Sequence, residues 1–340
     1  MTDRVRERGT WRAPLKRVAG SAWFRVVVAF GIVYLLIYFN RINWRALGTL
    51  EETWPWLMLA FALMLPPFLV VAYRLKVVLC SQQIEVPYAQ ALRWTMIGSF
   101  FDLAMPSSNG GDLIKAGLIA RHVGYGMRTR AIMAVAFDRV LGLVGLFLLA
   151  GVVGAAGWHF VKDVPGRQYL LAASLGASVG VLFVFRVLGA RRLYNHPRLN
   201  RLLERKGRWG GRARQLIRAF NGLRERPSQL AIALMLSIAN HVFWCASLIC
   251  IARAVGNAVP LIEGFIVFPL AIFGNIFGVA GGFGIGTAAF DVLLSLFLGI
   301  KNGALIGLIF QSLSAVSKLL GLPTYLASPG REPGRAEPQT

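Results

Sequence analysis

The first candidate binding residues lie where an apolar stretch of the sequence is interrupted. Asn109, Gly110 and Gly111 begin a new helix after the interruption, and Lys115 lies one turn into it. The free N–H groups of a helix N-terminus carry partial positive charge, and glycine lets a ligand approach the backbone closely. Together with the lysine, these residues predict a site for an anionic group such as a phosphate. A glycine corner with a purely structural role is the alternative.

Acidic residues surround this interruption. Asp102 lies inside the apolar stretch, four residues before Pro106, and Asp112 stands in the first turn of the new helix. Asp138 and Arg139 form an adjacent charged pair about one turn into a later apolar helix. Charged side chains at membrane depth are costly unless they are paired or hydrated, and they mark functional positions. They therefore predict either internal ion pairs that hold helices together or the lining of a polar cavity.

A second glycine-bearing interruption occurs in the other half of the chain. Gly281, Gly282 and Gly284 break an apolar run at 261–279, and a helix resumes after them. Broken helices at corresponding places in two halves of a membrane protein indicate a transport site near the bilayer midplane, often within an inverted repeat. The two interruptions therefore predict a carrier whose broken elements share one binding cavity.

The composition indicates the elements that must position these residues. Hydrophobic residues make up 56% of the 340, and charged residues only 15%, against roughly 25% in soluble domains. We expect an all-α, polytopic membrane helix bundle of seven to eight transmembrane helices with two broken or re-entrant elements. The stretch 88–105 is either a re-entrant hairpin or a full crossing. Six runs are long enough to cross hydrocarbon: 23–39, 54–73, 131–158, 169–185, 229–252 and 303–327.

The net charge of +22 is concentrated beside the apolar runs. Residues 186–226 hold thirteen Lys or Arg against two Glu. Basic residues that flank membrane spans mark the cytoplasmic side and contact anionic lipid head groups, so this pattern argues against nucleic-acid binding. Arg74, at the end of a span, and Arg121 are expected to contact head groups, with Arg74 snorkelling toward the surface.

The same pattern divides the chain. We expect a basic cytoplasmic N-terminal segment at 1–22, an integral membrane domain at 23–327, and a disordered tail at 328–340. Within the membrane domain, 186–227 is predicted to be a basic amphipathic cytoplasmic loop. This orientation predicts a multi-pass protein of the inner (cytoplasmic) cell membrane with its N-terminus in the cytoplasm. The three cysteines and four histidines lack metal-ligand spacing, so no metal or cofactor is expected.

Several short pieces of the sequence resemble the transmembrane region of lysylphosphatidylglycerol synthases, a flippase-like family of integral membrane proteins. The resemblance implies translocation of a lipid: an aminoacyl-phospholipid, a polyprenyl-phosphate-linked sugar or a hopanoid-like lipid. Two positions depart from the family's usual second turn: Ala280 replaces a proline, and Thr287 replaces a glutamate for which Asp291, one turn later, is a candidate substitute. The resembling pieces are 73–74, 98–101, 105–106, 110–112, 137–139, 141–143 and 281–284.

Two other function classes fit the same residues. A membrane-embedded lipid-modifying transferase would need clustered acids, which Asp102, Asp112 and Asp138 would provide with His122. An accessory subunit would only bind a partner lipid-synthesis enzyme. The leading hypothesis is a lipid flippase that is not an enzyme, whose partners are membrane lipids with anionic head groups.

Overall fold

The computed structural model describes residues 34, 50–104, 110–162, 166–188, 225–277 and 282–327. The regular elements of these residues are helices, which confirms the all-α prediction. The long helices are α3 (Leu50–Leu63), α4 (Pro66–Ser81), α5 (Tyr88–Ala104), α6 (Gly110–His122), α7 (Arg128–Ala156), α9 (Arg167–Leu188), α13 (Pro227–Ala254), α14 (Leu261–Gly274), α15 (Ile285–Leu298) and α16 (Gly303–Leu319). The short ones are η2 (Tyr125–Met127), α8 (Trp158–Lys162), η3 (Asn275–Phe277) and α17 (Gly321–Leu326).

Four helical segments of the described residues are long and apolar enough to cross a membrane. They are Thr53–Ser81, which joins α3 and α4, Arg128–Ala156, Pro227–Ala254 and Gly303–Leu326. Large apolar side chains lie exposed along them, as expected where the solvent is lipid rather than water. The chain is therefore a multi-pass membrane protein. Examples of these exposed side chains are Met58, Leu69, Val152, Met235 and Val316.

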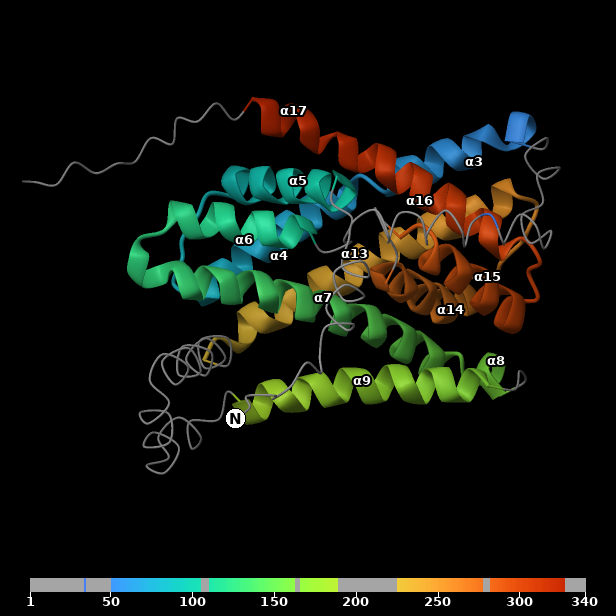
Figure 1. Ribbon diagram of the computed structural model, residues 1–340. Helices are drawn as coiled ribbons and strands as arrows, with labels where there is room; N and C mark the ends of the chain where they lie inside the picture. The colour runs from blue at the N-terminus through green and yellow to red at the C-terminus, as the bar shows by residue number, and fades with distance from the viewer. Residues whose placement is uncertain are drawn as a thin grey trace, which may run out of the picture.

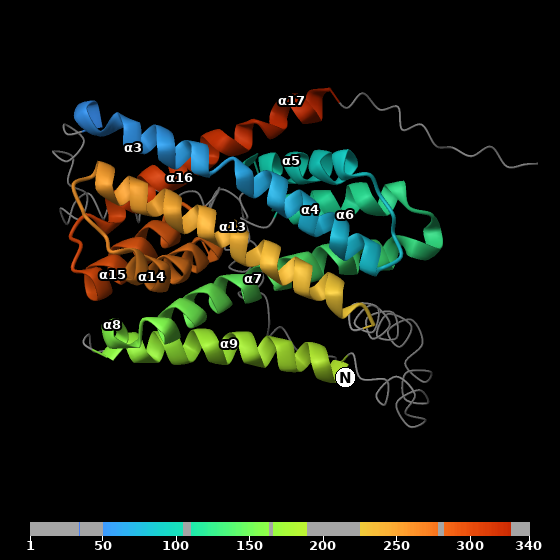
Figure 2. The same cartoon turned by 180° about the vertical axis from the view of Figure 1, so that it is seen from behind.

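Two pairs of shorter helices form hairpins between the long ones. The helices α5 and α6 pack against each other, and so do α14 and α15. With 17, 13, 14 and 14 residues, these helices are about 20–25 Å long, less than the ~30 Å thickness of the hydrocarbon core. In both ribbon views the open ends of the hairpins lie at opposite ends of the molecule, and their closed ends point toward its centre (Figures 1 and 2).

The chain passes through the same order of elements twice. In the first half the joined helix α3–α4 is followed by the α5–α6 hairpin and then by α7 (Figure 1). In the second half α13 is followed by the α14–α15 hairpin and then by α16. Each element of the second half runs in the direction opposite to its counterpart, as Figure 1 shows.

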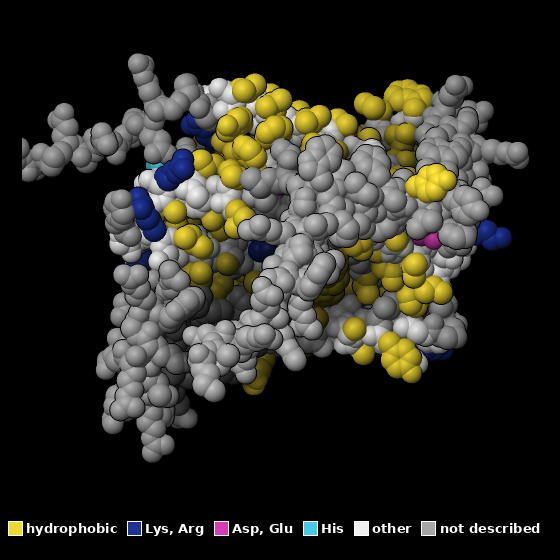
Figure 3. Space-filling model, viewed as in Figure 1, with side chains coloured by type: hydrophobic (Ala, Val, Ile, Leu, Met, Phe, Trp, Pro, Cys, Tyr) yellow, Lys and Arg dark blue, Asp and Glu magenta, His cyan; other side chains and the backbone are white. Residues whose placement is uncertain are grey.

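Two apolar clusters hold the helices together. One lies mainly on α4, α5, α6 and α7 and includes Leu79, Trp94 and Leu141. The other lies mainly on α13, α14, α15 and α16 and includes Phe268 and Phe290. On the visible face, hydrophobic side chains spread across the molecule, while Lys and Arg side chains gather at the left end, beside α5 and α6 (Figure 3).

Several predicted segments lie outside the described residues. These are the N-terminal segment 1–22, all but one residue of the first apolar run at 23–39, most of the basic loop at 186–227, and the tail 328–340. The end of α9 and the start of α13, between which this loop lies in the sequence, are on the same side of the molecule in both views (Figures 1 and 2).

Candidate functional site

A polar cavity lies between the two hairpins. Its volume is about 270 Å³, close to the lower end of the usual range for small-molecule sites, which suits a small polar group rather than a whole lipid. Residues of α5 and α6 line it from one side, and residues of α14 and η3 from the other. The charged lining residues are Arg74, Asp102, Asp112, Lys115, Asp138, Arg139 and Lys318, and the uncharged polar ones include Thr95, Ser99, Asn240, His241, Asn275 and Ser314.

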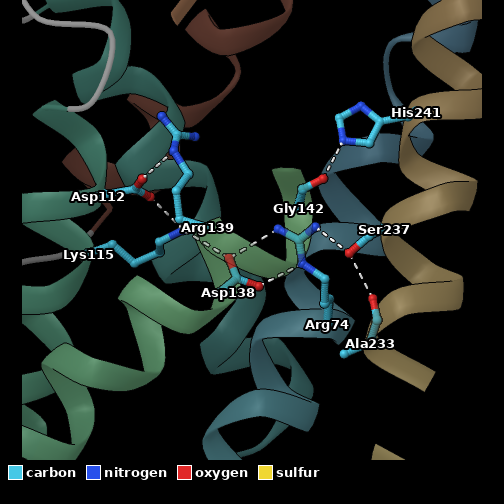
Figure 4. A network of polar contacts seen from close by, with 9 residues as sticks. All are labelled: Arg74, Asp112, Lys115, Asp138, Arg139, Gly142, Ala233, Ser237 and His241. Carbon is cyan, nitrogen blue, oxygen red and sulfur yellow. Dashed lines mark hydrogen bonds and ion pairs between the residues drawn. The ribbon is translucent and has the colours of Figure 1, made fainter. Parts of the chain in front are cut away.

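Charged side chains of α4, α6 and α7 form one continuous network on the cavity wall (Figure 4). The Asp138 carboxylate accepts two hydrogen bonds from the Arg74 guanidinium, at 2.7 and 3.2 Å. The Lys115 ammonium lies 3.7 Å from Asp138 and 3.0 Å from Asp112, and Arg139 lies 3.1 Å from Asp112. Asp138 and Arg139 are thus both cavity lining and parts of ion pairs between helices, which joins the two alternatives left open by the sequence.

Arg74 does not snorkel to the surface. Only 5% of the residue is exposed, because its guanidinium turns inward between α7 and α13. In addition to Asp138 it donates a hydrogen bond of 2.9 Å to Ser237 of α13. A buried cation needs such partners, since desolvation of an unpaired charge is strongly unfavourable. The predicted snorkelling of Arg74 is therefore wrong, and this side chain faces the cavity instead.

The first interruption depends on close contact between two glycines. The backbones of α5 and α6 approach each other at Gly98 and Gly111, where a β-carbon on Gly111 would overlap the Gly98 carbonyl. This approach brings the N-terminus of α6 beside α5. There the Gly111 N–H donates a hydrogen bond of 2.9 Å to the Asp102 carboxylate. Asp102 thus occupies part of the helix N-terminus at which we expected an external anion.

The second half of the chain contributes a cation to this region. Lys318 of α16 lines the cavity and interacts electrostatically with Asp102. The described lining residues therefore include four Lys or Arg and three Asp side chains, an excess of one positive formal charge. Such an excess favours the entry of one anionic group into the cavity.

The second interruption is held by a glutamine. The Gln311 side chain of α16 donates hydrogen bonds to Asn275 Oδ1 and to the Gly282 carbonyl, at 2.9 and 3.0 Å. It accepts a bond of 2.8 Å from the Thr287 hydroxyl of α15. Gly282 has a φ of +118°, a conformation that side-chain-bearing residues rarely adopt, so a glycine is required there. One buried amide thus joins η3, the turn and α15.

Comparison with known proteins identifies the family of the chain. The family model of the lysylphosphatidylglycerol synthase TM region matches residues 22–321. The chain belongs to this family. Membership confirms the resemblance seen in the sequence and indicates a function related to membrane lipids. No curated protein and no solved structure matches the chain.

The structure shows what replaces the family's usual glutamate after the second turn. Thr287 is fully buried and is bonded to Gln311 rather than open to the cavity. Asp291, the candidate substitute, is also buried but is not a lining residue of the cavity. In this family member the polar groups that reach the cavity near the second hairpin are those of Asn275 and Ser314.

Loss of the Gln311 side chain should destabilise the second interruption. Gln311→Ala removes three hydrogen bonds, each worth about 0.5–1.5 kcal/mol, and leaves buried partners such as the Thr287 hydroxyl without them. We expect a clear fall in the melting temperature of the detergent-solubilised protein. Ser312→Ala, at the exposed neighbouring position, serves as the control and should leave it unchanged. Equal melting temperatures of the two variants would contradict this assignment.

The other predicted site residues are placed as follows. Gly110 is buried at the start of α6, and Gly284, with a φ of +82°, precedes α15. Asn109 and Gly281 lie outside the described residues. Arg121 is exposed near the end of α6, away from the cavity lining, so its contact with head groups stays a prediction.

Sequence reasoning missed the part of the lining that α13 and α16 provide. Asn240 and His241 of α13 and Lys318 of α16 are polar residues within otherwise apolar helices. Isolated polar residues in such helices are themselves a signal of function. The missed signal was the occurrence of Asn240, His241 and Lys318 inside apolar helices, which the structure brings to one cavity.

Proposed function

We propose that this protein moves a lipid with an anionic or polar head group across the bilayer, with the head group passing through the central cavity. The observation that carries the proposal is the cavity itself, which both hairpins line and which has an excess of one positive charge. Lipid tails need no polar path, because they stay in hydrocarbon while the head group crosses. A small charged cavity at the junction of two interrupted helices provides that path.

The arrangement of the hairpins supports a re-entrant topology. The α5–α6 hairpin would enter the membrane from one face and the α14–α15 hairpin from the other, within two inverted repeats. Arg121, Arg128, Arg130 and Arg226 lie at the end of the molecule where α6 ends and where α7 and α13 begin. By the positive-inside rule, this end is cytoplasmic in the inner membrane. Because α17 ends there too, the proposal puts the end of α17 on the cytoplasmic side (Figure 1).

Transport should depend on Lys115. Its replacement in Lys115→Met leaves Asp138 paired with Arg74 and Asp112 paired with Arg139, so the fold should persist while the cavity loses its excess positive charge. We expect translocation to slow by about tenfold or more, which corresponds to ~1.4 kcal/mol or more of barrier height. The measurement is the rate at which a fluorescent phosphatidylglycerol, a monoanionic probe, crosses reconstituted vesicles. Asp102→Asn should slow it as well, because it removes the carboxylate that joins the N-terminus of α6 to Lys318 of the other half.

The control is Lys162→Met, which removes an exposed lysine of α8 outside the cavity. This variant should transport like the unchanged protein. If Lys115→Met and Asp102→Asn both transport at the normal rate while inserted and monodisperse, the cavity is not the path of the head group. The proposal would then be wrong.

Analysis of the lipid in the same vesicles distinguishes a carrier from a transferase. A flippase changes the leaflet of the lipid and leaves its mass unchanged, whereas a transferase yields a new product in the mass spectrum. His122, which we considered as a partner for the three acids, packs against Trp94 and does not line the cavity. We therefore propose that the protein is not an enzyme. Failure of the purified protein alone to move lipid would favour the accessory subunit.

A further inference from the structure

A polar stripe runs along one face of α13. Ser237, Asn240, His241 and Trp244 are separated by three, one and three residues, which places them on the same side of a helix. Ser237 accepts a hydrogen bond from Arg74, and His241 Nε2–H donates one of 3.0 Å to the Gly142 carbonyl of α7. Figure 4 shows both residues on the side of α13 that faces α4 and α7. The stripe therefore begins at the charged network and continues along the cavity wall to Trp244.

Three residues of this wall carry a buried polar atom without a hydrogen-bond partner. These atoms are Thr95 Oγ1 of α5, Asn240 Oδ1 and His241 Nδ1. Thr95 and Asn240 are only 4% and 6% exposed, and all three residues line the cavity. A buried polar atom without a partner costs about 1–3 kcal/mol, so a ligand that supplies hydrogen-bond donors here would be stabilised. The side chains are uncharged, and Nδ1 of His241 is an acceptor because its Nε2 carries the proton.

The charges of the wall limit what the donor-bearing group can be. Each lining carboxylate already has a partner: Asp138 has Arg74, Asp112 has Lys115 and Arg139, and Asp102 has the Gly111 N–H. No described lining carboxylate is therefore left to receive an ammonium group. An added cation would also meet the excess positive charge of the cavity, which is unfavourable.

We infer that the cavity selects a head group with one negative charge and uncharged hydroxyl groups. Thr95, Asn240 and His241 form the hydroxyl subsite beside the network of Arg74 and Lys115, and the excess positive charge of the lining balances the charge of the head group. A polyol or sugar phosphodiester has this chemistry, whereas an aminoacylated, net cationic head group does not. The inference rests on the proposed function, since it specifies the head group that this same cavity accepts.

The test measures binding in detergent, without a bilayer, so that it is independent of transport. The probes are short-chain phosphatidylglycerol, phosphatidylmethanol, which keeps the charge and lacks the hydroxyls, and lysylphosphatidylglycerol, which is net cationic. We expect phosphatidylglycerol to bind about tenfold more tightly than phosphatidylmethanol, the equivalent of one or two hydrogen bonds. Lysylphosphatidylglycerol should bind most weakly. Equal binding of the first two probes, tighter binding of the third, or no binding at all would overturn the inference.

Two variants locate the subsite. Thr95→Val, which is nearly isosteric, and Asn240→Leu should each reduce the preference for phosphatidylglycerol and leave the affinity for phosphatidylmethanol unchanged. Ser178→Ala is the matched control, because it removes a buried hydroxyl of α9 that does not line the cavity. If neither Thr95→Val nor Asn240→Leu changes the preference, the hydroxyl subsite is wrong. Should the preference persist in a protein that fails to move lipid in vesicles, the proposed function fails and the binding assignment stands.

Discussion

Replacement of Asp138 with Asn is expected to destabilise the protein by about 3–5 kcal/mol, the usual effect of removing one partner from a buried ion pair. Asp138 is 2% exposed and is the carboxylate to which Arg74 donates two hydrogen bonds. Its loss leaves the guanidinium of Arg74 buried without a counter-charge and weakens the tie between α4 and α7. Thermal unfolding in detergent measures this effect, and a large fall in melting temperature is the expected result.

A double variant separates stability from function. In Arg74→Met with Asp138→Leu, both charges disappear together, so most of the lost stability should return while transport remains impaired. Arg130→Gln provides the control, because Arg130 bonds to Gln83 in an exposed pair whose contribution is below about 1 kcal/mol. Full transport by the double variant would show that the pair serves the fold alone. An Asp138→Asn protein as stable as the unchanged one would contradict the buried pair itself.

A methyl group at Gly111 should separate α5 from α6 and abolish transport. In Gly111→Ala the new β-carbon would overlap the Gly98 carbonyl and lie 2.8 Å from the Asp102 carboxyl carbon. Backbone atoms cannot rotate away as side chains do, so the helices must shift, at a cost of about 1–3 kcal/mol or more. The shift would also break the bond from the Gly111 N–H to Asp102. Melting temperature and lipid transport should both fall.

The matched control lies on the same helix. A β-carbon at Gly117 would meet no atom within 4 Å, so Gly117→Ala should leave transport unchanged. Since alanine favours helix over glycine by up to ~1 kcal/mol, this variant should be slightly more stable than the original protein. A Gly111→Ala protein that behaves like Gly117→Ala would show that α5 and α6 are not in backbone contact.

The sequence predicted which segments form helices better than it predicted which helices pack against each other. Long apolar runs predicted the helices α7, α13 and α16, because the length needed to cross a bilayer is visible in one segment. Glycine and proline likewise marked the two interruptions, because their effect on the backbone is confined to one segment of the chain. The α5–α6 packing depends also on Gly98, whose role appears only when the helices are placed side by side.

The site was predicted in part. The rarity of charge inside apolar helices predicts Asp102, Asp138 and Arg139, and the start of the new helix predicts Asp112 and Lys115; all five line the cavity. Their pairing could not be read from spacing, since Arg74 and Asp138 are separated by 64 positions in the sequence. For that reason Arg74 was placed at the surface.

The helix α16 interacts with both hairpins, so a movement of this helix would act on both. Near its middle, Gln311 bonds to the turn of the second hairpin, and in its last turn Lys318 faces Asp102 of the first. The two positions lie about 10 Å apart along one rigid rod. A tilt of that rod would displace both contacts at once, so in the proposed carrier the two hairpins would be mechanically coupled and would not move independently.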